Sequence, residues 1–353
     1  MSRRFGSARG GATARRSTLT LNTPLIPFRY QRGLELPAHD FWLDPPTRKA
    51  SAFVSHAHSD HVARHAEVVA TRATLALLHT RLPGPRDEHA LDFGVATPWR
   101  GAQITLLPAG HILGSAQIFV ESDGGSLLYT GDFKLRPSLA AEPAEWRRAD
   151  TLIMETTFGL PRYVLPPTAE TLARMIAFCR EAHADNAVPV LLGYALGKAQ
   201  EIICALHAAG LTPMLDDSVW KMTRVYRALR PDFPRTCLRF DPHEVAGKVI
   251  VCPPGAHRTG PIAALPNRRT AVLTGWAIES SAKYRHHCDA AFPLTDHADY
   301  PDLLRYVELV QPRRVFTLHG FAAEFATDLR RRGIEAWALS AENQLELPLA
   351  AKG

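Results

Sequence analysis

A chain of 353 residues is long enough for one large domain or two ordinary ones with a sizeable core. Its 46% hydrophobic and 22% charged residues are typical of a globular protein, and we find no apolar run of the roughly 18 residues that a membrane span needs. The net charge of +6 favours a polyanionic partner such as nucleic acid but does not establish one.

The chain begins with an Arg-, Ser- and Gly-rich segment, residues 1–19, that contains no acidic residue. This segment also lacks the apolar stretch of a secretory signal. We therefore predict a disordered basic tail that could contact nucleic acid. An organelle transit peptide is the alternative that this composition allows.

Short apolar segments that end at Gly, Pro or polar residues predict buried strands along the whole chain. They cover residues 51–56, 115–122, 126–132, 151–157, 188–194, 248–254, 270–276 and 313–320. The stretch Ser122-Asp123-Gly124-Gly125 between two of them predicts a hairpin turn.

Helical patterns alternate with the later strands. Residues 170–184 carry apolar side chains at i, i+3, i+4 and i+7, residues 198–210 end on Gly210, and residues 300–312 have Pro near both ends. The early third is rich in strands and hairpins, whereas the rest alternates strand and helix, which predicts an α/β protein with mixed sheets. Proline-rich breaks at 159–168 and near 286–294 mark candidate domain boundaries.

The stretch SHAHSDHVARH, residues 55–65, has the spacing H-x-H-x-D-H. His56 and His58 are two residues apart at the end of a strand, so they point the same way and could reach one metal. Asp60 and His61 follow at a turn, where we expect a helix to begin, and could address a second metal. Imidazole and carboxylate ligands suit zinc. We place His65 on the helix surface and give it no role.

Three more polar residues follow apolar runs. His111 lies in PAGHILGSAQ, Asp132 in LLYTGDF and His319 in VFTLHGF. A lone histidine in such a position is usually a hydrogen-bonded core residue, and the first cluster alone could be a surface loop. Several such residues at strand ends instead indicate one shared site at the ends of the strands, where functional residues of α/β sheets gather.

These motifs, together with Asp44 in FWLDP, resemble those of the metallo-β-lactamase fold. The resemblance implies a four-layered αββα sandwich with a two-zinc site. It assigns one zinc to His56, His58 and His111, the other to Asp60 and His61, and a bridging position to Asp132. Asp44 would orient a ligand histidine or the water.

Later motifs resemble those of one branch of that fold, the β-CASP nucleases. They are Glu155 in TLIMETTFG, His297 in FPLTDHADYPDLLRYV and His319, which would complete the second zinc site. About 140 residues of βα pattern between Glu155 and His297 resemble the inserted β-CASP cassette. The resemblance implies a metallo-β-lactamase domain of residues 20–160 and 293–353 and an inserted β-CASP α/β domain of residues 161–292. The chain most resembles the bacterial ligase-associated DNA exonucleases, on the basis of the stretches PLTDHADY and TGWA and its compact length.

The resemblance implies a zinc-dependent phosphodiesterase, a DNA exonuclease of 5′ to 3′ polarity that acts in repair. Two Zn²⁺, with Mn²⁺ as an alternative, would activate water, and His297 would be the general acid with Glu155 holding it. Alternatives are an RNA-processing β-CASP nuclease, a small-molecule hydrolase of the same fold, and a catalytically silent scaffold.

The implied partners are DNA and the ATP-dependent DNA ligase and helicase of one repair system, with no membrane. The five cysteines are scattered without a C-x-x-C pair, which argues against a disulfide framework and favours a reducing cytoplasm. The resemblance implies that this is the cytoplasm of a bacterium, at the nucleoid.

Two residues are candidates for nucleic-acid contacts. Lys198 in GYALGKAQE follows a glycine turn at a helix start, where free N–H groups and a lysine suit a phosphate. A solvated lysine in a tight turn is the alternative. Trp276 in TGWA could stack a base, with a buried core tryptophan as the alternative.

Overall fold

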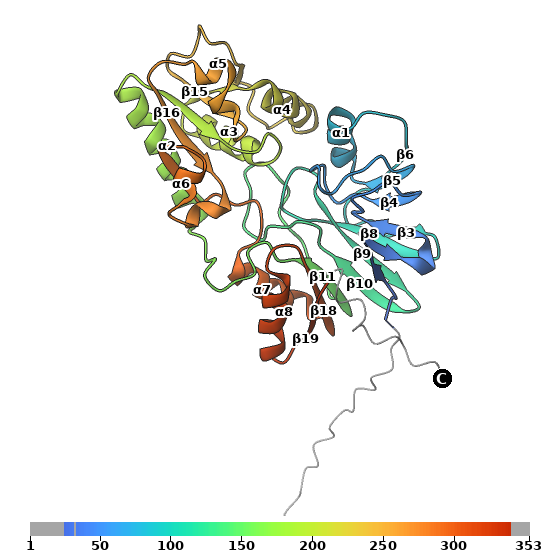
Figure 1. Cartoon of the computed structure of the whole chain (residues 1–353). Helices are drawn as coiled ribbons and strands as arrows, with labels where there is room; N and C mark the ends of the chain where they lie inside the picture. The colour runs from blue at the N-terminus through green and yellow to red at the C-terminus, as the bar shows by residue number, and fades with distance from the viewer. Residues whose placement is uncertain (1–24, 32, 340–353) are drawn as a thin grey trace, which may run out of the picture.

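The structure is a computed structural model that describes residues 25–31 and 33–339. The predicted basic tail at residues 1–19 lies outside these ranges. Figure 1 shows two parts, of which one contains both the blue early segments and the red late segments. We call this part the sandwich, and we call residues 168–292, which form the other part, the inserted unit. Among the described residues, no helix is both long and apolar enough to cross a membrane.

The first sheet of the sandwich comes from the early part of the chain. In spatial order its strands are β1 (Arg29–Tyr30), β2 (Leu34–Leu36), β3 (Phe41–Leu43), β4 (Ser51–Phe53), β5 (Glu67–Ala70) and β6 (Asp87–Ala90). Pairing is antiparallel up to β3 and parallel from β3 to β6. A 3₁₀ turn, η1 (Pro37–His39), joins β2 to β3, and helix α1 (Arg72–Arg81) joins β5 to β6.

The second sheet combines segments from before and after the inserted unit. Its order is β19 (Glu335–Ala338), β18 (Arg314–Leu318), β11 (Thr151–Glu155), β10 (Gly125–Tyr129), β9 (Ala116–Ser122), β8 (Ala102–Pro108) and β7 (Thr97–Trp99). The predicted hairpin is confirmed, because Ser122 pairs with Gly125 across the turn between β9 and β10. Helices α7 (Tyr300–Val310) and α8 (Ala322–Arg331) accompany the late strands.

The two sheets pack face to face and helices cover their outer faces. Alternate residues of a strand point to opposite faces, so in β8 and β9 the side chains of Leu106 and Ile118 meet the first sheet while Phe119 points away. The outward face of the second sheet packs under α7 and α8, and α1 covers the first sheet. These layers are the predicted αββα sandwich.

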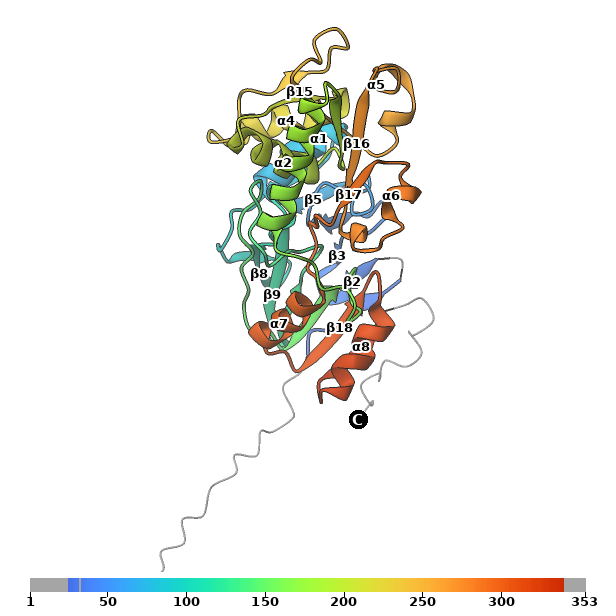
Figure 2. The same ribbon diagram turned by 90° about the vertical axis from the view of Figure 1, so that its left-hand side faces the viewer.

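The inserted unit contains a third, fully parallel sheet. Its order is β14 (Leu238–Arg239), β13 (Thr212–Leu215), β15 (Lys248–Cys252), β12 (Val188–Leu192), β16 (Arg268–Leu273) and β17 (Ala290–Phe292). The helical elements are α2 (Thr168–Ala184), α3 (Lys198–Ala208), α4 (Asp217–Leu229), η2 (Ala256–Arg258), α5 (Gly260–Ala263), η3 (Gly275–Ile278) and α6 (Ala282–Arg285). Helices α2, α3 and α4 share one core cluster with α1 of the sandwich, so the two parts pack directly on each other (Figure 2). The domain boundaries at residues 161 and 292 stay a prediction.

The expected helix at Asp60 and His61 is wrong. The chain makes a turn there and reaches β5 as a loop, and α1 begins only at Arg72. His65 is correspondingly not on a helix surface but buried at 2% exposure, where its Nδ1 accepts a hydrogen bond of 3.2 Å from the backbone N–H of Lys49. This contact fixes the loop as the crossover between parallel strands β4 and β5. All five cysteines are free thiols.

Candidate metal centre and active site

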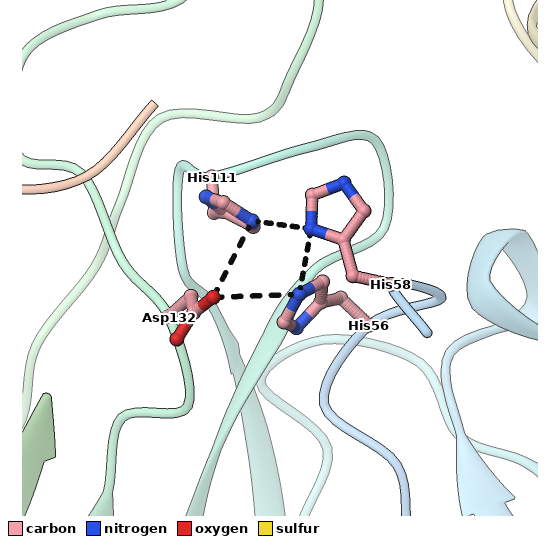
Figure 3. Close-up of side chains that lie close together, drawn as sticks. All are labelled: His56, His58, His111 and Asp132. Carbon is pink, nitrogen blue, oxygen red and sulfur yellow. Dashed lines mark hydrogen bonds and ion pairs between the residues drawn. The ribbon is translucent and has the colours of Figure 1, made fainter. Parts of the chain in front are cut away.

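Four side chains converge at one end of the sandwich, as Figure 3 shows. His56 follows β4, His111 lies between β8 and β9, and Asp132 follows β10, so the loops at strand ends bring them together with His58. Their facing ligand atoms all lie within 4.8 Å of one another. The Nδ1 of His58 is 3.0 Å from the Nε2 atoms of both His56 and His111. Asp132 Oδ2 is 3.6 Å from His56 Nε2 and 3.8 Å from His111 Nε2.

The partner of each outer ring nitrogen fixes where the histidine carries its proton. Ser55 Oγ donates to Asp44 Oδ2 at 2.5 Å, so its oxygen is free to accept from His56 Nδ1 at 2.9 Å. His56 therefore keeps its proton on Nδ1 and presents a lone pair on Nε2.

Backbone carbonyls fix which ring nitrogen carries the proton in the other two histidines. His58 Nε2 donates to the carbonyl of Leu196 at 3.1 Å, and His111 Nδ1 donates to the carbonyl of Asp296 at 2.8 Å. Each ring then turns an unprotonated nitrogen toward the cluster. The 3.0 Å contacts in the cluster thus join acceptor to acceptor, which is an arrangement that a cation stabilises.

The pKa shifts in the cluster agree with unprotonated ring nitrogens that face one another. Burial lowers the pKa of His56, His58 and His111, in the case of His111 to about 3, so the rings are neutral at pH 7. Burial raises the pKa of Asp132, but His61 and His297 outweigh it and hold that pKa well below its usual range. Neutral imidazoles and an ionised carboxylate are the protonation states that bind metal. This donor set fits zinc, whose tetrahedral bonds of about 2 Å place ligand atoms about 3.3 Å apart.

The second predicted ligand set lies beside the first and is more open to solvent. His61 Nε2 is 3.3 Å from Asp132 Oδ2 and 3.8 Å from Asp60 Oδ2. The Asp60 side chain is 76% exposed, and the rings of His61 and His319 have centroids 5.8 Å apart. Asp132 Oδ2 lies within 3.8 Å of His61 of this set and of His56 and His111 of the first set, and its bridging role stays a prediction.

Asp44 lies behind the candidate ligand residues and contacts two of the elements that carry them. Its carboxylate accepts hydrogen bonds from the Ser55 N–H at 2.7 Å, from His61 Nδ1 at 3.0 Å and from the Tyr129 hydroxyl at 2.9 Å. Burial lowers the pKa of His61, but Asp132 and Asp44 outweigh it and raise that pKa well above its usual value. Asp44 thereby leaves His61 Nε2 directed at Asp132.

His297 and Glu155 form a pair at the edge of the cluster. His297 Nδ1 is 2.8 Å from Glu155 Oε1, and the His297 ring lies 4.8 Å from the His111 ring. Glu155 is fully buried and also accepts from the backbone N–H groups of Phe133 and Thr157. The carboxylate is therefore fixed, and it directs the other ring nitrogen of His297 away from itself.

Comparisons with known proteins agree with this geometry. No family model matches the chain. A probable DNA ligase of Opitutus terrae is 51% identical over 90% of this chain, and 5′ exonuclease Apollo of Gallus gallus is 27% identical over 80% of it. The chain spans 32% of the first relative and 61% of the second. A crystal structure of a protein of unknown function from Enterococcus faecalis superposes with a TM-score of 0.58 at 11% identity, covering 82% of this chain and 79% of that one.

Apollo and other matched relatives are β-CASP proteins of the metallo-β-lactamase fold. The chain belongs to that family. The match to a probable DNA ligase agrees with the predicted likeness to its ligase-associated members.

In this β-CASP protein the cluster opens into a cleft of about 700 Å³ between the sandwich and the inserted unit. The inserted unit contributes Tyr194, Ser218 and Trp276 to the lining of the cleft. The sandwich contributes Arg81, Phe158 and five of the candidate ligand residues, namely His58, Asp60, His61, Asp132 and His319. Tyr194 is 60% exposed, so its ring is available to a ligand in the cleft.

The two predicted nucleic-acid contacts have different environments. Lys198 is 2% exposed, and its ammonium donates to Asp296 Oδ1 at 2.8 Å and to the Leu294 carbonyl at 3.0 Å. Lys198 lines the cleft, but its ammonium is already paired, and the phosphate contact stays a prediction. Trp276 is half-buried against Phe158, with ring centroids 4.7 Å apart, and still lines the cleft.

Sequence reasoning missed several residues of the site. Ser55 and Asp296 each precede a predicted site histidine, and that adjacency was the available signal. Arg81 ends α1 and lines the cleft near Asp60, but a helix-terminal arginine has no distinctive sequence pattern. The Leu196 carbonyl is a backbone group, so no residue type could have marked it.

Proposed function

We propose that this chain is a metal-dependent DNA exonuclease that hydrolyses phosphodiester bonds from the 5′ end. The observation that carries the proposal is the His297–Glu155 pair beside the four-residue cluster, with His297 in the lining of the cleft that the cluster reaches. A metal site alone would serve many hydrolases, whereas an oriented imidazole beside it supplies the proton that an alcohol leaving group needs.

His56, His58, His111 and Asp132 would hold one zinc, and Asp60, His61, His319 and Asp132 the other, with Mn²⁺ as an alternative. When bound, the metals would supply Lewis acidity, lower the pKa of a water toward about 7 and neutralise charge on phosphoryl oxygens. Ser55 holds the proton of His56 on Nδ1, so His56 Nε2 is unprotonated on the side that faces the cluster. Asp44 accepts from His61 Nδ1 and so orients His61 Nε2 toward Asp132.

His297 is the general acid of the proposed reaction. Burial lowers its pKa, but the charges of Glu155 and Asp132 outweigh burial and raise that pKa to about 10. The ring is consequently protonated at neutral pH and can give a proton to the departing 3′ oxygen. Glu155 acts as a positioning residue, because it contacts His297 and not the substrate.

The choice of DNA rests on the relatives. Apollo is named a 5′ exonuclease, and the chain aligns with one third of a protein named a probable DNA ligase. We propose DNA as substrate and a DNA ligase as partner on that basis. The helicase partner expected from the sequence stays a prediction.

The test is a nuclease assay on the purified chain with matched single-stranded DNA and RNA. Each substrate is labelled separately at its 5′ and 3′ ends and incubated with and without chelator, and His297→Ala serves as the matched inactive variant. Chelator-sensitive release of a 5′-labelled mononucleotide from DNA, with RNA spared, is the expected result.

Other outcomes would overturn specific parts of the proposal. Internal cuts in RNA would replace the DNA exonuclease with an RNA-processing nuclease while leaving the metal chemistry intact. No cleavage of either substrate by protein that holds two zinc ions would overturn the nuclease and favour a small-molecule hydrolase.

A further inference from the structure

One turn of the inserted unit, residues 194–198, reaches over the candidate metal site of the sandwich. The carbonyl of Leu196 accepts the hydrogen bond of 3.1 Å from His58 Nε2, although the two residues are 138 positions apart. A neutral imidazole carries one proton, so this bond leaves His58 Nδ1 as the nitrogen that faces His56 and His111.

The same turn reaches a second histidine through Asp296. Lys198, which begins α3, holds the Asp296 carboxylate at 2.8 Å, and the Asp296 backbone carbonyl accepts from His111 Nδ1 at 2.8 Å. Lys198 and Asp296 are 2% and 7% exposed, so their ion pair is shielded from water and strong. Two positions of one turn thus orient two of the three histidines of the cluster.

The turn is tightly seated. Gly197 has a φ of +90°, and a Cβ at this position would lie 2.2 Å from Ile112 Cγ2, next to His111. The Gly197 N–H donates to Gln200 Oε1 at 2.7 Å, and Gln200 Nε2 donates back to the Ala195 carbonyl at 3.1 Å. The turn is therefore tied to α3 on one side and pressed against the sandwich on the other, with space for glycine only.

We propose that residues 194–198 are a positioning element of the metal site, through which docking of the inserted unit sets metal affinity. The turn selects the proton-bearing nitrogen of His58 directly and that of His111 through Asp296. A metal site whose outer partners come from a second unit is complete only when both units are packed together. This inference rests on the metal site of the proposed function.

The test compares Gly197→Ala with Gly255→Ala in the full-length chain. Gly255 also lies in the inserted unit and has a φ of +97°, but a Cβ there meets no described atom within 4 Å. Both variants place alanine at a similar positive φ, and only Gly197→Ala displaces the turn. Zn²⁺ affinity is measured by competition with a chromophoric chelator, and the d–d spectrum of bound Co²⁺ reports ligand geometry.

We expect Gly197→Ala to bind Zn²⁺ about 10- to 100-fold more weakly at one of two sites and to alter the Co²⁺ spectrum. Gly255→Ala keeps wild-type values. Adding Ile112→Ala to Gly197→Ala removes the Cγ2 and restores part of the affinity. If Gly197→Ala fails to fold, Lys198→Met tests the proposal in its place, because it removes the ion pair with Asp296 without adding bulk. Lys198→Met should weaken Zn²⁺ binding by a factor in the same range.

Wild-type affinity and spectrum in a folded Gly197→Ala or Lys198→Met variant would overturn the positioning role while leaving the metal site intact. An equal loss of Zn²⁺ affinity in Gly255→Ala would also overturn the positioning role, since backbone strain alone would then explain the weaker binding. Failure of the wild-type chain to bind Zn²⁺ or Co²⁺ would overturn the metal site itself, which is a separate result.

Discussion

At the scale of single residues, the Glu155–His297 pair predicts how activity depends on pH. Burial lowers the pKa of His297 and Glu155 raises it, with a net value of about 10. Glu155→Gln removes the charge but keeps the shape, so the pKa of His297 falls and the protonated ring is lost at lower pH. We expect the alkaline limb of the kcat/KM profile to move to lower pH, with activity best preserved on the acid side.

The control for this experiment is His297→Ala, which should keep its zinc and lose about 10²- to 10⁴-fold in rate at every pH. An alkaline limb that stays in place in Glu155→Gln, or wild-type rates in zinc-loaded His297→Ala, would show that His297 is not the acid.

Asp60 supports a prediction about metal stoichiometry. Its carboxylate is open to solvent and lies 3.8 Å from His61 Nε2, outside the buried four-residue cluster. Asp60→Ala should lower bound zinc from two ions per chain to one and reduce activity by about 100-fold or more. Elemental analysis after dialysis gives the count, and Asp123→Ala, in the hairpin between β9 and β10, is the matched exposed aspartate. Two retained ions would remove Asp60 from the ligand set.

At the scale of elements, helix α1 brings Arg81 to the cleft. Arg81 lies at the end of this helix and lines the cleft beside Asp60, opposite Tyr194 and Ser218 of the inserted unit. A guanidinium in this position can pair with a phosphate next to the scissile bond. Arg81→Ala should raise KM for single-stranded DNA several-fold with little change in kcat, and it should reduce the salt slope of binding by about one.

Arg72→Ala, at the opposite end of the same helix, should leave both quantities unchanged. Equal effects of the two substitutions would mean that general surface charge, and not a contact in the cleft, is responsible.

The elements were largely predictable because their apolar runs are short and well separated. Each predicted strand overlaps an observed one, and all of these observed strands except β9 end earlier than the predicted run. In residues 51–56, strand β4 ends at Phe53 because the Ser55 N–H donates to the Asp44 side chain and not to a neighbouring strand. The helix expected at Asp60 failed for a related reason, since His65 and Lys49 hold that segment as a loop. Side-chain hydrogen bonds that stop an element are not visible in an apolar pattern.

At the scale of the whole molecule, the convergence of the candidate ligand residues was predictable and the contacts that orient them were not. His56, His58 and Asp132 stand in motifs with distinctive spacing, so the sequence alone indicated a shared site. The Leu196 carbonyl and the buried position of Lys198 depend on how the inserted unit packs on the sandwich. Such long-range packing leaves no local signature, so the sequence alone could not show that Lys198 is paired with Asp296.

The packing of the two parts can be tested at a second contact. Lys134 of the sandwich and Glu201 of α3 form a buried ion pair with both oxygens of Glu201 at 3.1 Å from the ammonium. The side chains are 1% and 3% exposed, so removal of one partner leaves the other charge buried and unpaired. Glu201→Gln should lower the free energy of unfolding by about 3–5 kcal/mol, as measured by denaturant titration.

The double variant Lys134→Met with Glu201→Gln should recover part of that loss, because it leaves no unpaired charge. A single variant as stable as the wild type would show that this pair does not hold the inserted unit on the sandwich.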